Sequence, residues 1–256
     1  MGIWTTEIYQ EPLFWKFPIA ATVIGIVSFL LFALPMTWVA WRDPAWAAPW
    51  RIQKERRIEV QRWFWPSLRC MAINNLIMLP GLILSWPLLR LSGIHDGPLP
   101  AWYTVVWQLL FFILLDDFLY YWMHRAMHTK WLFRHVHAFH HRPRTPCAIA
   151  GNYLHWGEYI ATISLLLIGP MLVGAHVITL WIWVVIRQLE AADGHFGYDL
   201  PWNPLKFLPL YDGTGYHDFH HGYFKGNYAG ALGYLDKVFN TRSEGYARYA
   251  SSRIPR

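Results

Sequence analysis

One long run without a charged residue, Phe17 to Val39, restricts what this chain can fold into. About 20 consecutive apolar residues suffice for a helix that crosses the hydrocarbon core of a bilayer. Such a helix satisfies its own backbone hydrogen bonds, which lipid cannot do. Hydrophobic residues make up 55% of the 256 residues and charged residues only 15%, and there are 17 tryptophans. This balance is too apolar for a typical soluble domain and predicts a membrane protein.

Three further apolar runs follow, at 68–91, 102–123 and 159–186. Glycine and proline divide the last run near Gly169 into two limbs, each short for a full crossing. The sequence therefore predicts an all-α integral membrane bundle of about four spans, or of three spans plus a re-entrant hairpin. We expect one domain over 1–256, in which 124–158 and 190–256 form a histidine-rich cap.

The distribution of basic residues predicts which side the cap occupies. The segments 42–69 and 124–144 are rich in Lys and Arg, whereas 92–101 has neither. Since basic loops stay on the cytosolic side, we expect a multi-pass protein whose cap faces the cytosol. The net charge of +6 is then a topology signal and does not indicate nucleic-acid binding. The segment 42–69, in which tryptophans alternate with the basic residues, suits either anionic lipid or an acidic partner protein.

The N-terminal segment and the two cysteines give little further information. Residues 1–16 have no basic stretch or cleavage site, so we expect no removable signal peptide. Cys70 and Cys147 are the only cysteines and are not spaced as metal ligands. They imply no disulfide framework and favour a reducing compartment.

Histidines gather in three groups that point to metal binding. Residues three or four apart share one face of a helix, so each group can aim several imidazoles at one point. The groups are an HxxxH pair and two HxxHH triples, comprising His124, His128, His137, His140, His141, His217, His220 and His221. Imidazole binds Zn, Cu, Fe and Ni. Eight histidines exceed what one tetrahedral ion needs and suit two ions held almost wholly by nitrogen.

Other residues near these groups are candidates for lesser roles. His195, on a glycine-flanked loop, is a plausible single ligand. His155 and Glu158 lie three residues apart, and could add a ligand and a supporting carboxylate or could cap the next helix. Asp117 and Tyr121 share a helix face with His124 and His128, and a carboxylate there could accept a hydrogen bond from a ligand. Asp116 is a weaker candidate for the same role. We interpret His135 and His176 as structural and His95 as a solvated loop residue.

Four stretches of the chain resemble one family. HRAMH, HVHAFHH, GHFGYDLPWNPL and YHDFHHGYFKGNYAG resemble the fatty acid hydroxylase superfamily of membrane non-haem di-iron enzymes, and within it the C-4 methylsterol monooxygenases. The similarity covers roughly residues 100–245. It implies iron ligands at the eight histidines above and at His195. His155 falls where the family often has HPxE, but Trp156 replaces the proline. Tyr216 stands where many relatives have a histidine, and could mark a changed edge of the site.

The resemblance implies an activity, a cofactor and partners. The expected enzyme is a monooxygenase with two iron ions that uses O2 and two electrons to oxidise the C-4 methyl group of a sterol or sterol-like triterpenoid. The chain has no HPGG haem motif, so electrons from NAD(P)H should come through cytochrome b5 and its reductase. The expected location in the endoplasmic reticulum membrane follows from the resemblance alone. The alternatives are a fatty-acyl or sphingolipid hydroxylase, a sterol desaturase, a terpenoid oxidase of specialised metabolism and, more remotely, a histidine-rich metal transporter.

Overall fold

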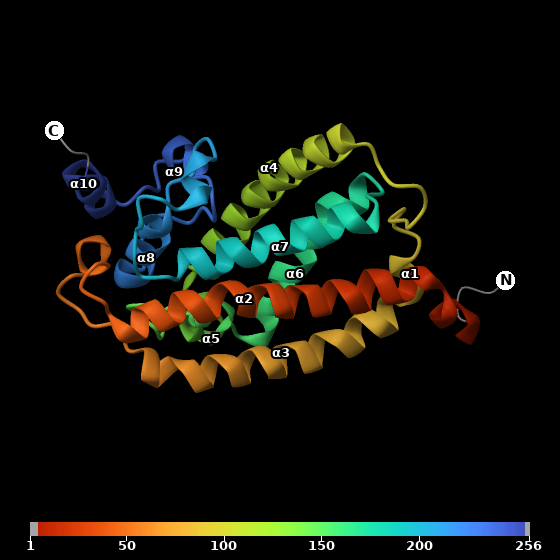
Figure 1. Ribbon diagram of the computed structural model, residues 1–256, viewed down its shortest axis with the longest axis horizontal. Coiled ribbons are helices and arrows are strands. Elements are labelled where there is room, and N and C mark those ends of the chain that lie inside the picture. Colours follow the sequence, from red (N-terminus) through yellow and green to blue (C-terminus); the bar gives the residue numbers. More distant parts are fainter. Residues whose placement is uncertain (1–4, 254–256) are drawn as a thin grey trace.

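The structure is a computed structural model that describes residues 5–253, and within that range the fold is all-helical, as predicted. Figure 1 shows the long helices running side by side, with short helices gathered at one end. In chain order the elements are η1 (Thr6–Gln10), α1 (Pro12–Phe14), η2 (Trp15–Ala20), α2 (Ala21–Arg42), η3 (Ala48–Trp50), α3 (Val60–Leu89), α4 (Trp102–Met127), α5 (Lys130–His135), η4 (His137–Phe139), η5 (Ala148–Asn152), α6 (Trp156–Leu172), α7 (Val177–Gly194), η6 (Pro204–Phe207), α8 (Thr214–Tyr223), α9 (Tyr234–Val238) and α10 (Glu244–Arg253).

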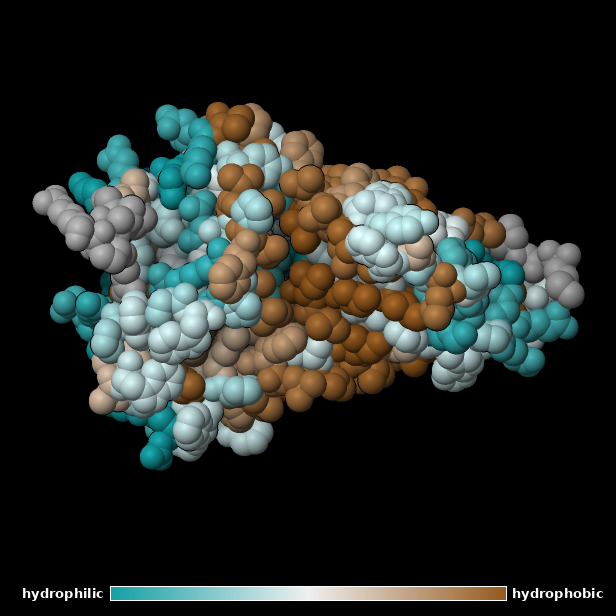
Figure 2. Space-filling view, turned by 45° about the horizontal axis from the view of Figure 1, so that its top comes forward, coloured by the Kyte–Doolittle hydropathy of each residue, from teal (hydrophilic) through white to brown (hydrophobic). Residues whose placement is uncertain are grey.

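Three helical stretches of the described chain are long and apolar enough to cross a membrane: Pro12–Arg42, Val60–Leu89 and Trp102–Met127. Large apolar side chains on them are exposed, as lipid-facing residues would be, among them Leu31, Leu76 and Leu84. Figure 2 shows a hydrophobic band across the middle of the molecule between two more polar ends. α3 starts at Val60, so the end of the basic segment 42–69 is helical rather than a loop.

The fourth apolar run forms a helical hairpin, α6 and α7. Its tip lies against the loop between α3 and α4, where the His95 N–H donates to the Ala175 carbonyl at 3.2 Å and the Val177 N–H donates to the His95 carbonyl at 2.9 Å. Gly174, with φ of 54°, allows the tight turn, and a Cβ there would lie 3.0 Å from the Gly93 carbonyl oxygen. Because its tip reaches the loops at the far end, the hairpin extends along the bundle and does not turn back midway.

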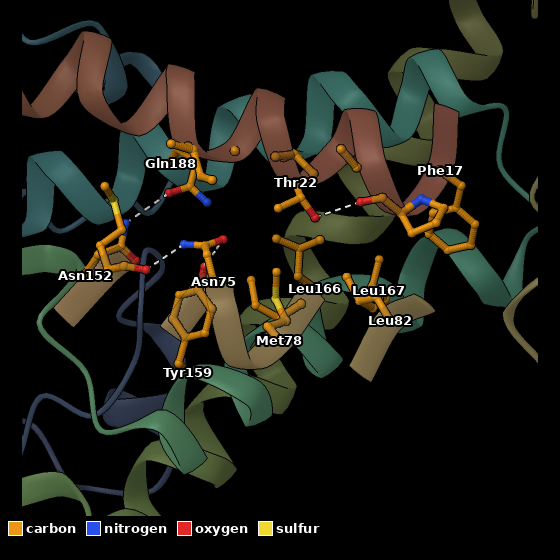
Figure 3. A pocket seen from close by; sticks show the side chains of 17 residues that line it. Phe17, Thr22, Asn75, Met78, Leu82, Asn152, Tyr159, Leu166, Leu167 and Gln188 are labelled. Atoms are coloured by element: carbon orange, nitrogen blue, oxygen red, sulfur yellow. Dashed lines mark hydrogen bonds between the residues drawn. The ribbon is translucent and has the colours of Figure 1, made fainter. Parts of the chain in front are cut away.

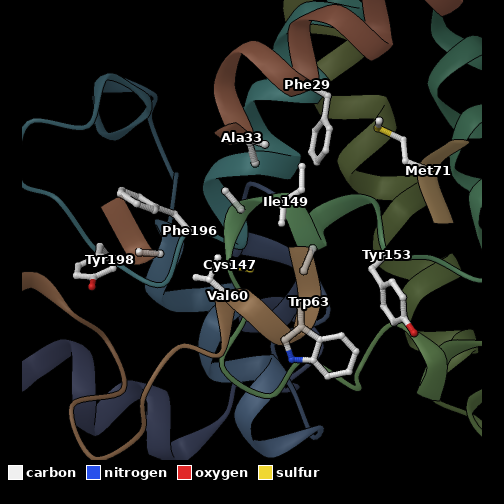
Figure 4. Packing of buried hydrophobic residues seen from close by; sticks show 14 of the residues in the cluster. Phe29, Ala33, Val60, Trp63, Met71, Cys147, Ile149, Tyr153, Phe196 and Tyr198 are labelled. Carbon is white, nitrogen blue, oxygen red and sulfur yellow. The ribbon is translucent and has the colours of Figure 1, made fainter. Parts of the chain in front are cut away.

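A hydrophobic core fixes the segment that follows the first histidines. Cys147, Ile149 and Tyr153 pack with Phe29 of α2 and Trp63 of α3 (Figure 4). The same cluster includes Phe196 and Tyr198, directly after His195. This core thus joins two regions that carry histidines, although about fifty residues separate them in the sequence.

The basic loop between α2 and α3 lies at the same end of the bundle as the histidines. The Ile52 N–H donates to the Gly197 carbonyl at 3.1 Å. The Gln53 amide donates to the Asp218 carboxylate on α8 and to the Arg144 carbonyl, both at 2.8 Å. The two segments that the sequence places on one side of the membrane are therefore in contact.

Candidate metal centre

Four segments deliver histidines to one end of the bundle. His124 and His128 end α4, and His137 begins η4, with His140 and His141 directly after it. His195 ends α7. The triple His217, His220 and His221 lies on α8. The structure brings all nine together in two groups.

The first group has five members: His124, His128, His137, His141 and His220. Their Nε2 atoms lie close to one another. The His124–His137 distance is 3.0 Å and the His137–His141 distance is 2.9 Å. His220 lies 3.1 Å from His128 and 3.2 Å from His141. The five nitrogens thus surround one point.

The second group has four members: His140, His195, His217 and His221. The Nε2 atom of His195 lies 3.3 Å from that of His140, 3.2 Å from that of His217 and 3.1 Å from that of His221. The groups are neighbours, since the ring centroids of His141 and His221 are 4.7 Å apart. Two centres therefore lie side by side.

Hydrogen bonds at the opposite ring nitrogen fix the protonation of most of these rings. A carbonyl oxygen can only accept a hydrogen bond, so an Nδ1 that bonds to one must carry the hydrogen, and the Nε2 of a neutral ring is then a lone pair. Nδ1 donates to a carbonyl in His124 (Tyr228), His140 (Tyr153), His195 (Ala191), His220 (Gly226) and His221 (Pro143), over 2.7 to 3.2 Å. Lone pairs about 3 Å apart repel, so this arrangement calls for a cation between them.

Burial keeps these rings neutral. Desolvation lowers the pKa of His137 and His140 to about 3 and that of His195 to about 4. It also lowers the pKa of His217, His220 and His221 well below the usual 6.5. Neutral imidazole is the form that binds metal, so both groups are prepared as ligands at neutral pH.

The spacing of the nitrogens fits first-row transition metals. Nitrogens bound at 2.1 Å are about 3.0 Å apart at right angles and about 3.4 Å apart in a tetrahedron. The first group, at 2.9 to 3.2 Å, matches right angles, and five such donors leave one of six positions open. Its members also include a buried Nδ1 without a hydrogen-bond partner, in His141. Nine nitrogen donors fit two ions with imidazole ligands.

Glu158 supports the first group directly. His137 Nδ1 and Glu158 Oε1 are 2.7 Å apart, and both side chains are buried. Burial raises the pKa of Glu158 to about 7. A carboxylate in this position orients the ring and increases its basicity toward a metal.

His155 lies outside both groups. Its Nδ1 accepts a hydrogen bond from the Gly157 N–H at 3.2 Å and so caps the start of α6. Capping was one of the two roles that the sequence left open for this residue. In this structure His155 therefore has a capping role and is not among the grouped histidines.

The acidic residues of α4 contact other partners than the histidines. The Asp117 carboxylate accepts the backbone N–H groups of Ala231 and Leu232, at 3.0 and 2.9 Å. The Tyr121 hydroxyl lies 2.9 Å from that of Thr241. Both thus hold the cap on α4, whereas we had expected a carboxylate that accepts from a ligand. Asp116 forms an ion pair with Arg187 of α7.

The buried carboxylate of Asp236 was missed in the sequence. It accepts from the backbone N–H groups of Tyr228 and Ala229 and from the Tyr216 hydroxyl, the last at 2.6 Å. Because the Tyr228 carbonyl holds His124, Asp236 fixes the backbone that orients a member of the first group. No motif marks it in the sequence. Tyr216, which we had considered as a changed edge of the site, donates its hydroxyl hydrogen to Asp236 and lies outside both histidine groups.

Two adjoining cavities lie between the membrane-facing helices and the second group. The first, of about 50 Å³, lies among α2, α3, α6 and α7 and is lined mainly by apolar side chains such as Phe17, Met78 and Leu167 (Figure 3). The second, of about 90 Å³, is lined by His140, His195 and His217. The linings share Asn152, Tyr159, Ile163, Leu166 and Gln188. Both are smaller than typical ligand pockets of about 300–1,000 Å³, so a lipid must displace side chains to enter.

This geometry defines a class: a helical membrane protein with two buried histidine groups that suit metal ions. Residues 109–241 match the fatty acid hydroxylase family, so the chain belongs to that family. It is similar to very-long-chain aldehyde decarbonylase GL1-11 of Oryza sativa subsp. indica, 44% identical over 178 residues, 68% of this chain and 67% of the relative.

Methylsterol monooxygenases are also among its relatives. Methylsterol monooxygenase 2-2 of Arabidopsis thaliana is 42% identical over 176 residues, 67% of this chain and 66% of the relative. Methylsterol monooxygenase 1-3 of the same plant is 35% identical over 228 residues, 86% of this chain and 77% of the relative. No solved structure matches the chain. The family and these relatives make the chain an oxidoreductase of lipid metabolism.

Proposed function

We propose that this chain is a di-iron monooxygenase that hydroxylates the C-4 methyl group of a sterol or sterol-like triterpenoid. The observation that carries the proposal is the pair of histidine groups, with five and four Nε2 atoms, beside a cavity that shares part of its lining with an apolar one. The nine ligands would be His124, His128, His137, His141 and His220 for one ion and His140, His195, His217 and His221 for the other.

The residues around the ions would prepare the reaction. Bound iron would supply the activation of O2: one oxygen atom enters the C–H bond as a hydroxyl group, and the other leaves as water after taking up two electrons and two protons. The backbone carbonyls and Glu158 hold the imidazoles in the tautomer that binds metal. Burial of both groups keeps bulk water away from the reacting carbon. The apolar cavity would hold the hydrocarbon part of the substrate.

The electrons would come from NAD(P)H through cytochrome b5 and its reductase. Support comes from exposed basic side chains at the histidine end of the bundle, including Lys54, Arg56, Arg134 and Arg144. Such a surface attracts an acidic donor protein. By the positive-inside rule the same residues favour a cytosolic site, and a methylsterol substrate would favour the endoplasmic reticulum membrane.

Turnover with isotopically labelled oxygen tests this function. The purified protein in lipid nanodiscs receives a 4,4-dimethylsterol, ¹⁸O2, NADPH, cytochrome b5 and its reductase. We expect ¹⁸O in the C-4 substituent and two iron ions per chain. The variant His221→Ala should form no product, and His135→Ala, at an exposed residue outside both groups, should retain activity. Hydroxylated acyl chains with an unchanged sterol would contradict the proposal.

A second candidate substrate is a very-long-chain aldehyde. The 44% identity to rice GL1-11 favours it. The same nanodisc preparation with a long-chain aldehyde would then release a hydrocarbon one carbon shorter, whereas a methylsterol monooxygenase would leave the aldehyde without that product.

A further inference from the structure

The two adjoining cavities differ in chemistry. Side chains such as Leu82, Leu167 and Val184 line the first. The second carries polar side chains on the wall it shares with the histidines, among them Arg187 and Glu190. Among the described residues, the first lining also has Thr22, Asn75, Asn152 and Gln188 but no charged side chain, whereas the second has Glu158, Arg187 and Glu190. A lipid that fills both would therefore meet charged groups at its end next to the second histidine group.

The polar wall is built from α4, α6 and α7. Arg187 forms ion pairs with Glu190 on its own helix and with Asp116 of α4, the latter at 3.3 Å. The Arg187 guanidinium also lies 5.9 Å from the centre of the Tyr120 ring. Gln188 accepts from the Asn152 amide at 3.5 Å. One cation thus faces two carboxylates in a mostly buried site.

A buried acceptor without a partner lies in the same cavity. Glu158 is only 3% exposed and lines the second cavity. Its Oε1 contacts His137, whereas its Oε2 is buried and has no hydrogen-bond partner among residues 5–253. An unsatisfied buried acceptor costs about 1–3 kcal/mol. A ligand that donates a hydrogen bond here would remove that cost.

We propose that this wall, formed by Tyr120, Glu158, Arg187, Gln188 and Glu190, binds the oxygen-bearing end of the substrate. The inference rests on the proposed function and names its substrate class: lipids with a hydroxyl group within a few bonds of the carbon that is oxidised. The hydroxyl donates to a carboxylate of the wall, and the hydrocarbon part extends through the shared lining into the first cavity.

This placement determines which carbon reacts. The polar wall and His140, His195 and His217 line one small cavity, so the carbon presented to the second histidine group lies near the polar end. In a 4-methylsterol, the methyl-bearing carbon is bonded to the carbon that carries the hydroxyl group. Oxidation in the middle of a long acyl chain does not fit this arrangement.

Equilibrium binding without turnover tests the inference. The full-length protein with its metal, in nanodiscs without O2 or reductant, is titrated with 4,4-dimethylcholestan-3β-ol and with 4,4-dimethylcholestane, which lacks only the hydroxyl group. Octadecan-1-ol and octadecane form a second pair. We expect the alcohol to bind about tenfold or more tightly than the hydrocarbon in at least one pair. Equal affinities within both pairs, or no binding of any of the four compounds, would overturn the inference. Equal affinities are the result expected if the wall binds only water.

Two variants locate the effect. Glu190→Gln keeps the side-chain shape and leaves Arg187 paired with Asp116, and Gln188→Leu removes a polar group at the junction of the cavities. Each should reduce the preference for the alcohol by about threefold or more. The control Leu167→Ala, in the first cavity only, should weaken both members of a pair equally. A preference that survives in both polar variants would overturn the assignment of the wall.

Oxygenase activity provides an independent readout. If the protein oxidises a lipid far from its oxygen-bearing end, this inference is wrong and the proposed oxygenase remains. If it binds the alcohol selectively but incorporates no oxygen from O2, the proposed oxygenase is wrong and the binding wall remains.

Discussion

The two histidine groups lie side by side but differ in number and surroundings. The first has five nitrogens and the second four. Three of the four rings in the second group line the second cavity, which adjoins the apolar first cavity. None of the rings in the first group lines it. If each ion had six ligands, five donors would leave one position for another ligand and four would leave two. Metal sites that act on substrates keep open positions, so the second group is the one suited to face the substrate.

Substitution of two adjacent histidines should distinguish the two groups by the largest effect. His220 and His221 are adjacent on α8 but belong to different groups. We expect His220→Ala to lose the ion of the first group and His221→Ala that of the second, each leaving one ion per chain. Activity should fall more than about 100-fold in both, since loss of a ligand exceeds the 10–100-fold effect of losing a residue that supports one.

Metal analysis together with turnover rates measures this effect. His135→Ala is the control, because His135 is exposed and its Nδ1 donates to the Trp131 carbonyl. Either ligand variant with two ions and full activity would refute the separation into two centres.

Substitution of Glu158 tests whether loss of a residue that orients a ligand of the first group also affects the second group. Glu158→Leu removes the partner of His137, and should weaken metal binding to the first group by about 10–100-fold while the second group changes little. Asp117→Asn should leave both metal affinities near those of the parent and lower the free energy of unfolding by about 1–3 kcal/mol, because Asp117 holds the cap and no imidazole. Chelator competition and thermal unfolding give the two quantities. Equal weakening of both groups by Glu158→Leu would show that the groups act as one site.

A glycine offers a milder change that is confined to the second group. A Cβ on Gly151 would lie 2.5 Å from the Ala191 carbonyl oxygen, which accepts the hydrogen bond of His195. Gly151→Ala should therefore displace His195 and weaken the second group about threefold to tenfold, with the first group unchanged. Gly222→Ala is the matched control, since its Cβ meets nothing closer than 3.7 Å. Unchanged metal binding in Gly151→Ala would mean that the Ala191 contact does not position His195.

The sequence indicated the helices and the histidines better than the residues that hold them. Helical spacing shows which residues share a face, so the long apolar runs and the histidine groups could be identified. It does not show which carbonyl or carboxylate arrives from a distant segment. Asp117 shares a face with His124, yet it binds the backbone at 231–232. Asp236, about a hundred residues from His124, fixes the carbonyl that orients it.

The hairpin shows the same limit. Gly174 predicts a turn in the last apolar run, but the loop that the turn meets lies about eighty residues earlier in the chain. Helix length alone therefore left a full-length hairpin and a re-entrant one equally open, and only the contact with His95 and Gly93 distinguishes them.

The smallest expected effect is that of protons on metal binding. Burial lowers the pKa of His137 and His140 to about 3 and that of His195 to about 4, so the folded groups stay unprotonated at pH 5.5. In an exposed imidazole about nine tenths of the free base would be lost at that pH. We expect the metal affinity of both groups to change less than about twofold between pH 7.5 and 5.5.

The lowered pKa values of these histidines also make the stability of the metal-free protein depend on pH. Unfolded histidines take up protons near pH 6.5 and the folded ones only near pH 3–4, so the contribution of these histidines to the free energy of unfolding falls as the pH drops below about 6.5. Chelator competition at pH 7.5 and 5.5, with thermal unfolding of metal-free protein, checks both statements. A second group that weakens tenfold at pH 5.5 while the first does not would show that water reaches the second group through its cavity, and would sharpen the contrast between the two centres.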